Sequence, residues 1–115
     1  MPTLEHEPRL ALPVSDGIVF VHFDKILRLQ ADGSYTRLYC VDGKRYVASK
    51  GLGHFESVLP PPLFLRCHHA HIINLSKVVK ATRNGGFRAA LITGVSVEVS
   101  RRRWRAFVSA FSANE

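Results

Sequence analysis

The segment Val95-Ser96-Val97-Glu98-Val99-Ser100 alternates apolar and polar side chains at every position. Successive side chains of a β-strand point to opposite faces of a sheet, so this segment predicts a strand with one buried and one solvated face. Residues 87–92 show a less regular form of the same alternation, and the turn signal Thr93-Gly94 lies between the two segments. The C-terminal half of the chain therefore contains at least two predicted strands.

The same period continues upstream. Turn signals recur at Asp32-Gly33, Asp42-Gly43 and Asn84-Gly85-Gly86, and Asp42-Gly43 fits a tight hairpin turn in which glycine adopts a positive φ. The segments between these signals predict further strands over residues 18–23, 25–31, 35–41, 44–49 and 77–83. We therefore expect a mostly β fold.

Two segments show helical spacing instead. The first helix would be capped by Ser49 and stopped by Pro60-Pro61-Pro62, with an apolar face formed by Leu52, Phe55, Val58 and Leu59. The second would be capped by Ser100, with an apolar face formed by Trp104, Phe107, Val108 and Phe111. Both are expected to be short helices that pack against the sheets.

The composition is that of one soluble globular domain. The chain has 115 residues, of which 46% are hydrophobic and 22% charged. No apolar stretch reaches the ~18 residues that a transmembrane helix requires, and two cysteines are too few for a disulfide scaffold. We expect a cytoplasmic protein with no membrane contact by this segment, in which residues 1–16 are a tail or linker remnant and residues 17–115 are the domain.

The net charge is the first indication of function. It is +7 for the whole chain, and because residues 1–16 contain one arginine and three acidic residues it is +9 for residues 17–115. A small, strongly basic domain favours an anionic partner, with nucleic acid first and a membrane surface or an acidic protein as alternatives. Simple solubility is the remaining explanation.

The densest polar cluster lies in residues 64–74, which contain Cys67, His68, His69 and His71. Zinc binds such side chains, but structural zinc sites usually bring ligand pairs from separate turns, and the other histidines lack that spacing. A cysteine nucleophile would need a base within hydrogen-bond reach, and the chain has no phosphate-binding glycine loop or paired carboxylates. We therefore expect no enzyme activity, no metal and no cofactor, with Cys67 a small, half-buried residue.

A second cluster, Arg101, Arg102, Arg103 and Arg105, follows Ser100 at the start of the second predicted helix. Cations at a helix N-terminus oppose the helix dipole, so they are poorly placed for stability. A phosphate or a guanine edge would bind both the guanidinium groups and the free backbone amides there. A solvated helix end is the alternative.

Together these segments resemble the LytTR family of bacterial DNA-binding domains. The resemblance rests on residues 64–74 (Phe-x-Arg-Cys-His-His-Ala-His-Ile-Ile-Asn) and on Val99-Ser100-Arg101-Arg102 at the end of a strand. Upstream, Asp24-Lys25-Ile26 before a strand and Gly33-Ser34-Tyr35 in a turn agree with it. The resemblance covers about residues 17–111.

The resemblance implies an elongated arrangement of small antiparallel sheets with two short helices, in which loops rather than a recognition helix read the major groove. It implies base contacts by Tyr35, His69 and Arg102, and contacts to the DNA backbone by His68, Ser100 and Arg101. His69 stands where many members carry Arg or Asn, so base preference does not transfer. Asn74 is expected to fix its own loop. Arg28, at a strand position that is normally apolar, would mark a surface contact or a sheet edge.

The function implied is that of a sequence-specific DNA-binding output domain of a bacterial transcriptional regulator, as found in two-component signal transduction. Its partner would be double-stranded DNA, bound as direct repeats by two copies. A sensor or receiver domain would belong to a longer parent protein. The alternative is a protein-interaction or regulatory module of the same fold that has lost DNA binding.

Overall fold

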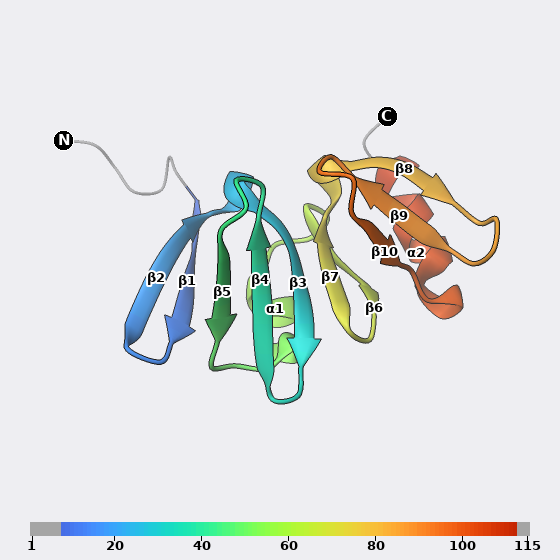
Figure 1. Cartoon of the computed structure of the whole chain (residues 1–115). Coiled ribbons are helices and arrows are strands. Elements are labelled where there is room, and N and C mark those ends of the chain that lie inside the picture. The colour runs from blue at the N-terminus through green and yellow to red at the C-terminus, as the bar shows by residue number, and fades with distance from the viewer. Residues whose placement is uncertain (1–7, 113–115) are drawn as a thin grey trace.

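Three antiparallel sheets lie side by side along the molecule (Figure 1). The computed structural model describes residues 8–112. Its dimensions are 45 × 35 × 25 Å, an elongated shape for a chain of this length. The predicted mostly β class, with small sheets and two helices, is confirmed.

The first sheet is a hairpin of β1 (Arg9–Val14) and β2 (Gly17–His22). Its inner face carries Leu10, Leu12 and Val21, which are buried in the first of two core clusters. The expectation of a tail over residues 1–16 is therefore wrong for residues 9–14, which form a strand of the folded unit. Residues 1–7 lie outside the described residues.

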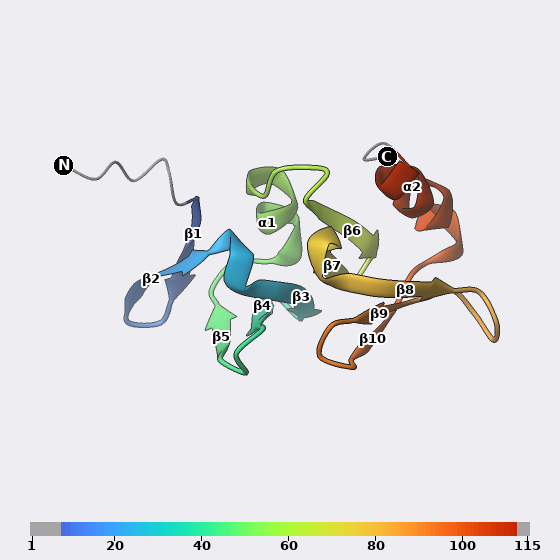
Figure 2. The same cartoon turned by 90° about the horizontal axis from the view of Figure 1, so that it is seen from above.

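The second sheet has five strands in the order β5-β4-β3-β7-β6. After the 3-10 turn η2 (Phe23–Lys25), the strands are β3 (Ile26–Asp32), β4 (Tyr35–Cys40), β5 (Arg45–Ala48), β6 (Phe64–His68) and β7 (His71–Asn74). Helix α1 (Leu52–Val58) covers one face, as Figure 2 shows from above, and buries Leu52 and Phe55 there. Among residues 8–112, no helix covers the opposite face of β5-β4-β3, which is drawn toward the viewer in Figure 1.

The third sheet has the order β10-β9-β8 and packs with the C-terminal helix. It follows the 3-10 turn η3 (Leu75–Lys77) and consists of β8 (Val78–Thr82), β9 (Arg88–Leu91) and β10 (Ser96–Glu98). Helix α2 (Arg101–Ser112) buries Phe107 in the second core cluster, together with Val97, Val99 and Ile73. Ile73 belongs to β7, so this core joins the second sheet to the third.

The two predicted helix caps have different outcomes. Ser100 caps α2 as predicted, since the Arg103 amide donates to Ser100 Oγ at 3.3 Å. The predicted cap at Ser49 is wrong, because Gly51 is the N-cap of α1 and makes no side-chain cap bond. The Ser49 amide instead donates to the Pro13 oxygen at 2.9 Å, which ties the end of β5 to β1.

Two expectations about side-chain placement are wrong, and one about a turn is confirmed. Val58 and Val108 are 48% and 41% exposed, so neither helix buries the full predicted stripe. Arg28 lies in β3, the central strand of the five, and the sheet-edge explanation for it is wrong. Gly43 adopts a φ of +92° in the β4–β5 turn, as the Asp42-Gly43 signal predicted.

Within the described residues, no helix has the length and apolar character needed to cross a membrane.

Candidate nucleic-acid interface

Three exposed elements end on the same edge of the molecule, the lower edge in Figure 1. They are the β3–β4 turn, the β6–β7 turn and the N-terminus of α2. Together they carry all six residues for which the resemblance implies a DNA contact. Tyr35 lies at the first turn, His68 and His69 at the second, and Ser100, Arg101 and Arg102 at the third.

The β3–β4 turn presents Tyr35 at the start of β4. Asp32 and Tyr35 are cross-strand partners, and Gly33 between them has a φ of +62°, which a residue with a Cβ rarely adopts. Tyr35 is 53% exposed. Beside it, Arg37 Nε donates to Asp32 Oδ2 at 2.8 Å, so the carboxylate nearest the tip of the turn is paired with a cation. The turn therefore presents an aromatic hydroxyl without an unpaired negative charge beside it.

The β6–β7 turn presents His69 and is fixed from behind by Arg66. His69 is exposed, and its main-chain oxygen accepts a hydrogen bond from Arg66 Nη2. Arg66 Nη1 donates to Glu56 Oε1 of α1 at 2.9 Å. One guanidinium thus holds the turn against the helix, because its planar fork can satisfy two acceptors at once.

His68 is oriented inward rather than toward solvent. Its Nδ1 accepts a hydrogen bond from the Ala70 amide at 3.1 Å, and its Nε2 lies 3.8 Å from Glu98 Oε2. Its ring centroid is 4.3 Å from that of His69. The implied backbone contact by His68 is not tested by this arrangement, which gives the side chain a role in shaping the turn.

The third element is the start of α2. Ser100 caps the helix through its side-chain oxygen and still has a hydroxyl proton to donate. Arg101 and Arg102 are exposed, whereas Arg103 is half-buried and donates from Nη1 to the Arg66 oxygen at 3.4 Å. The two outward guanidinium groups and the amides of the first helical turn are the kinds of donor that an anion such as a phosphate accepts from.

Hydrogen bonds join the three elements to one another. The Ala31 amide donates to the Ala70 oxygen at 2.9 Å, which connects β3 to the β6–β7 turn. The Ser100 amide donates to the Cys67 oxygen at 2.8 Å, which connects the start of α2 to β6. The positions of Tyr35, His69 and Arg102 are therefore linked through the second sheet.

Burial shifts the pKa values of two residues of the cluster, Cys67 and His71. Cys67 is completely buried, not half-buried as expected, and burial raises the pKa of its thiol to about 12. Burial, with the charge of His68 as the next cause, lowers the pKa of His71 to about 4. Among the described residues, no three or more His, Cys, Asp or Glu side chains are grouped to hold a metal ion.

The residues that hold the edge together are not apparent from the sequence. Arg66 and Glu56 are ten residues apart and meet only because α1 packs beside β6, so no local pattern indicates the pair. Arg103 was grouped with its exposed neighbours, but it faces β6 and lies on a different side of α2. Helical spacing could have separated it from Arg102, since adjacent helical positions point about 100° apart.

Comparisons with known proteins agree with this geometry. A family model for the LytTr DNA-binding domain matches residues 16–112. A solved LytTr DNA-binding domain from Bacillus cereus is similar over 90% of this chain and 95% of its own, with 25% sequence identity and a TM-score of 0.77. No curated protein matches significantly. This protein belongs to the LytTR DNA-binding domain family.

Proposed function

We propose that this chain is the sequence-specific DNA-binding output domain of a bacterial transcriptional regulator, reading the major groove with turns and a helix end. The observation that carries this proposal is the common edge formed by the β3–β4 turn, the β6–β7 turn and the N-terminus of α2. Tyr35, His69 and Arg102 are all exposed on it, and hydrogen bonds connect the three elements.

In this proposal the three exposed side chains contact base edges. A guanidinium binds the O6 and N7 atoms of guanine with two hydrogen bonds, and an imidazole or a phenol can donate to, or accept from, a base edge. Ser100, Arg101 and His68 contact phosphates, which sets the register and contributes most of the affinity. The net charge of +9 over residues 17–115 favours association with any duplex.

We further propose that two copies bind two direct repeats, and that the target is chromosomal DNA in the cytoplasm. A sensor or receiver domain of a longer parent protein would control the pairing. The second candidate function is an interaction module that no longer binds DNA, and the replacement of a usual Arg or Asn by His69 favours it.

Selection of bound sequences from a random-sequence duplex pool distinguishes the two candidates. The proposal predicts an enriched motif present twice in the same orientation, bound at physiological salt about 10³-fold more tightly than random duplex. If no motif is enriched while the folded protein retains only weak, uniform binding, the interaction module is the better description. Single-site duplexes then test pairing, because two copies on repeats should bind more tightly than one copy on a half-site.

A further inference from the structure

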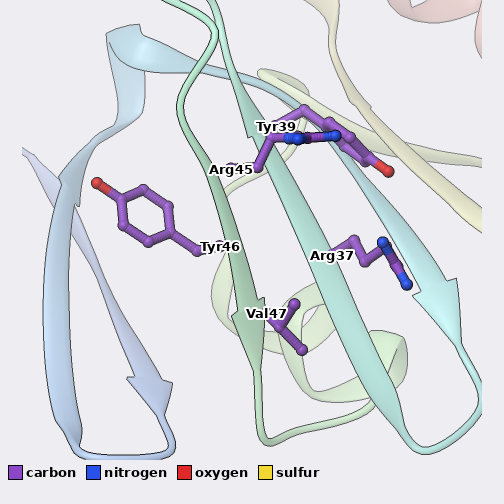
Figure 3. A pocket seen from close by; sticks show the side chains of 5 residues that line it. All are labelled: Arg37, Tyr39, Arg45, Tyr46 and Val47. Carbon is purple, nitrogen blue, oxygen red and sulfur yellow. The ribbon is translucent and has the colours of Figure 1, made fainter.

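The open face of the second sheet carries a cationic groove that extends beyond the proposed DNA-binding edge, which is formed by the β3–β4 turn, the β6–β7 turn and the N-terminus of α2. Two hollows adjoin there, of about 260 and 190 Å³, and they share Tyr39 and Arg45. Figure 3 shows the first, with Arg37 and Tyr39 on β4 and Arg45 and Val47 on β5. The second continues past Cys40 and Lys44 to the β9–β10 turn, where Thr93 and Val95 line it. We call this surface the β4–β5 groove.

The lining of the β4–β5 groove combines cations with apolar and aromatic surface. Four of its side chains are positively charged, namely Arg28, Arg37, Lys44 and Arg45. None of the described residues that line either hollow is acidic. Asp32 pairs with Arg37 at one end of the groove, but the other three cations have no ion pair with a described carboxylate within 4.0 Å.

Arg28 is the least expected of these cations. Its guanidinium lies over the ring of Tyr39, 4.0 Å from the centroid, and its Nη1 donates to Gln30 Oε1 at 2.8 Å, while its Nε is buried without a hydrogen-bond partner. A partly buried cation without a carboxylate is unfavourable unless something compensates for its desolvation. The contact with Tyr39 compensates in part and fixes the ring as a flat surface on the face of the sheet.

Most of the β4–β5 groove lies further from the edge than the major groove of DNA is deep. Strands rise about 3.3 Å per residue, so Tyr39 and its cross-strand partner Arg45 lie about 13 Å along β4 from Tyr35. The major groove of DNA is only about 8.5 Å deep. Arg37, about 7 Å along β4 from Tyr35, lies within that depth, whereas Arg28 and Arg45, both cross-strand partners of Tyr39, lie beyond it.

The length of the β4–β5 groove indicates the kind of ligand. Along β4 it runs from Arg37 to Cys40, about 10 Å, and it then continues past the β4–β5 turn to Thr93 and Val95. A small organic anion would fill one hollow, whereas an extended peptide segment would span both. Its carboxylates would pair with the guanidinium groups, and alternate apolar side chains would cover Val47 and Val95.

We propose that the β4–β5 groove binds an extended acidic segment of a partner protein, in which Asp or Glu alternates with aliphatic or aromatic residues. The segment lies along β4 over Tyr39, with its carboxylates on Arg28 and Arg45. This leaves the DNA-binding edge free, so the domain can hold DNA and the segment together. The site is independent of which bases, if any, the edge reads.

The test is a titration of the ¹⁵N-labelled chain with a ten-residue peptide that alternates Glu with Val and Tyr. Amide shifts should concentrate in β4, β5 and the β9–β10 turn, and Arg45→Gln should weaken binding at least about fivefold. The matched control is Arg83→Gln, an exposed cation after β8, which should leave affinity within about twofold. The same peptide with Arg in place of Glu should not bind.

Three results would overturn the proposal. The first is no saturable binding at a peptide concentration of about 2 mM. The second is shifts centred on the turns and the start of α2, because the peptide would then be an anion on the DNA-binding edge. The third is an Arg45→Gln variant that loses DNA affinity as severely as Arg102→Ala, which would assign the groove to DNA. Failure of DNA selection alone leaves the groove proposal standing, so the two claims are separable.

Discussion

Arg66 and His69 are joined by a hydrogen bond from the guanidinium Nη2 of Arg66 to the main-chain oxygen of His69. The same guanidinium donates to Glu56 of α1, and the main-chain oxygen of Arg66 accepts from Arg103 of α2. Both helices are thereby connected to the turn that presents His69. The direction of that side chain depends on packing behind the edge as well as on the turn itself.

Arg66→Lys tests this dependence, because lysine keeps the charge and loses the planar fork. Specific DNA affinity should fall about tenfold, since the turn is no longer held to α1, while affinity for random duplex stays within about twofold. The control is Arg88→Lys, which also loses a guanidinium that donates two hydrogen bonds, in this case to Ser96 of the third sheet. Equal losses on both duplexes for Arg66→Lys would show that Arg66 contributes only charge.

Asn74 should be among the most costly polar side chains to remove. It is buried, its Nδ2 donates to the Ile26 oxygen at 2.9 Å and to the Phe23 oxygen at 3.3 Å, and its Oδ1 accepts from the Ser76 amide. Asn74→Ala leaves these groups without partners, so the free energy of unfolding should fall by about 2–3 kcal/mol. Urea denaturation measures it, and a loss below that of the exposed Asn84→Ala, about 0.5 kcal/mol at most, would contradict the assignment.

The lowered pKa of His71 predicts a pH dependence of stability. Its pKa is about 4 in the folded chain against an ordinary value of 6.5, so between these values the unfolded state binds more protons. The contribution of His71 is complete above pH 6.5 and is lost as the pH falls toward 4, by up to about 3 kcal/mol. Between pH 6.5 and 4, the free energy of unfolding of His71→Gln should change less with pH than that of the parent. An unchanged slope, or the same flattening in His54→Gln, would disprove the claim.

The salt dependence of DNA binding should be steep. The edge and its surroundings offer about four to six phosphate contacts, and each neutralised phosphate releases a counterion, so log Kd against log salt should change with a slope of roughly 4 to 5 in magnitude. Arg101→Ala should reduce that magnitude by about one. A flat response for the parent chain would remove the electrostatic basis of the proposal.

The sequence predicts what depends on local pattern. Alternation located the strands, and the spacing of Phe107 and its neighbours located α2. The hairpin of β6 and β7 was not predicted as strands, because His68, His69 and His71 interrupt the alternation. The sequence does not indicate strand β1, because Pro13 lies within it. Strand β1 belongs to a two-stranded ribbon, in which a proline leaves no gap in a central ladder.

The exposed residues of the candidate site can be located from the sequence, whereas the residues that hold them in place cannot. Tyr35 and Arg102 follow a turn and a strand end, which are visible in sequence. The complete burial of Cys67 depends on its position in β6 on the face that packs into the second core cluster, and the pairing of Arg66 with Glu56 depends on the docking of α1. Such contacts arise from tertiary packing, so local spacing cannot report them.

The most direct test of the account compares Arg102→Ala with Arg105→Ala on a selected duplex and on a random duplex at one salt concentration. Both residues are exposed on α2, but Arg102 lies in its first turn at the edge and Arg105 lies further along the helix. Arg102→Ala should lose about 1–3 kcal/mol on the selected duplex and much less on the random one. Arg105→Ala should lose less, and equally on both. Indistinguishable behaviour of the two variants on both duplexes would contradict base reading by the start of α2.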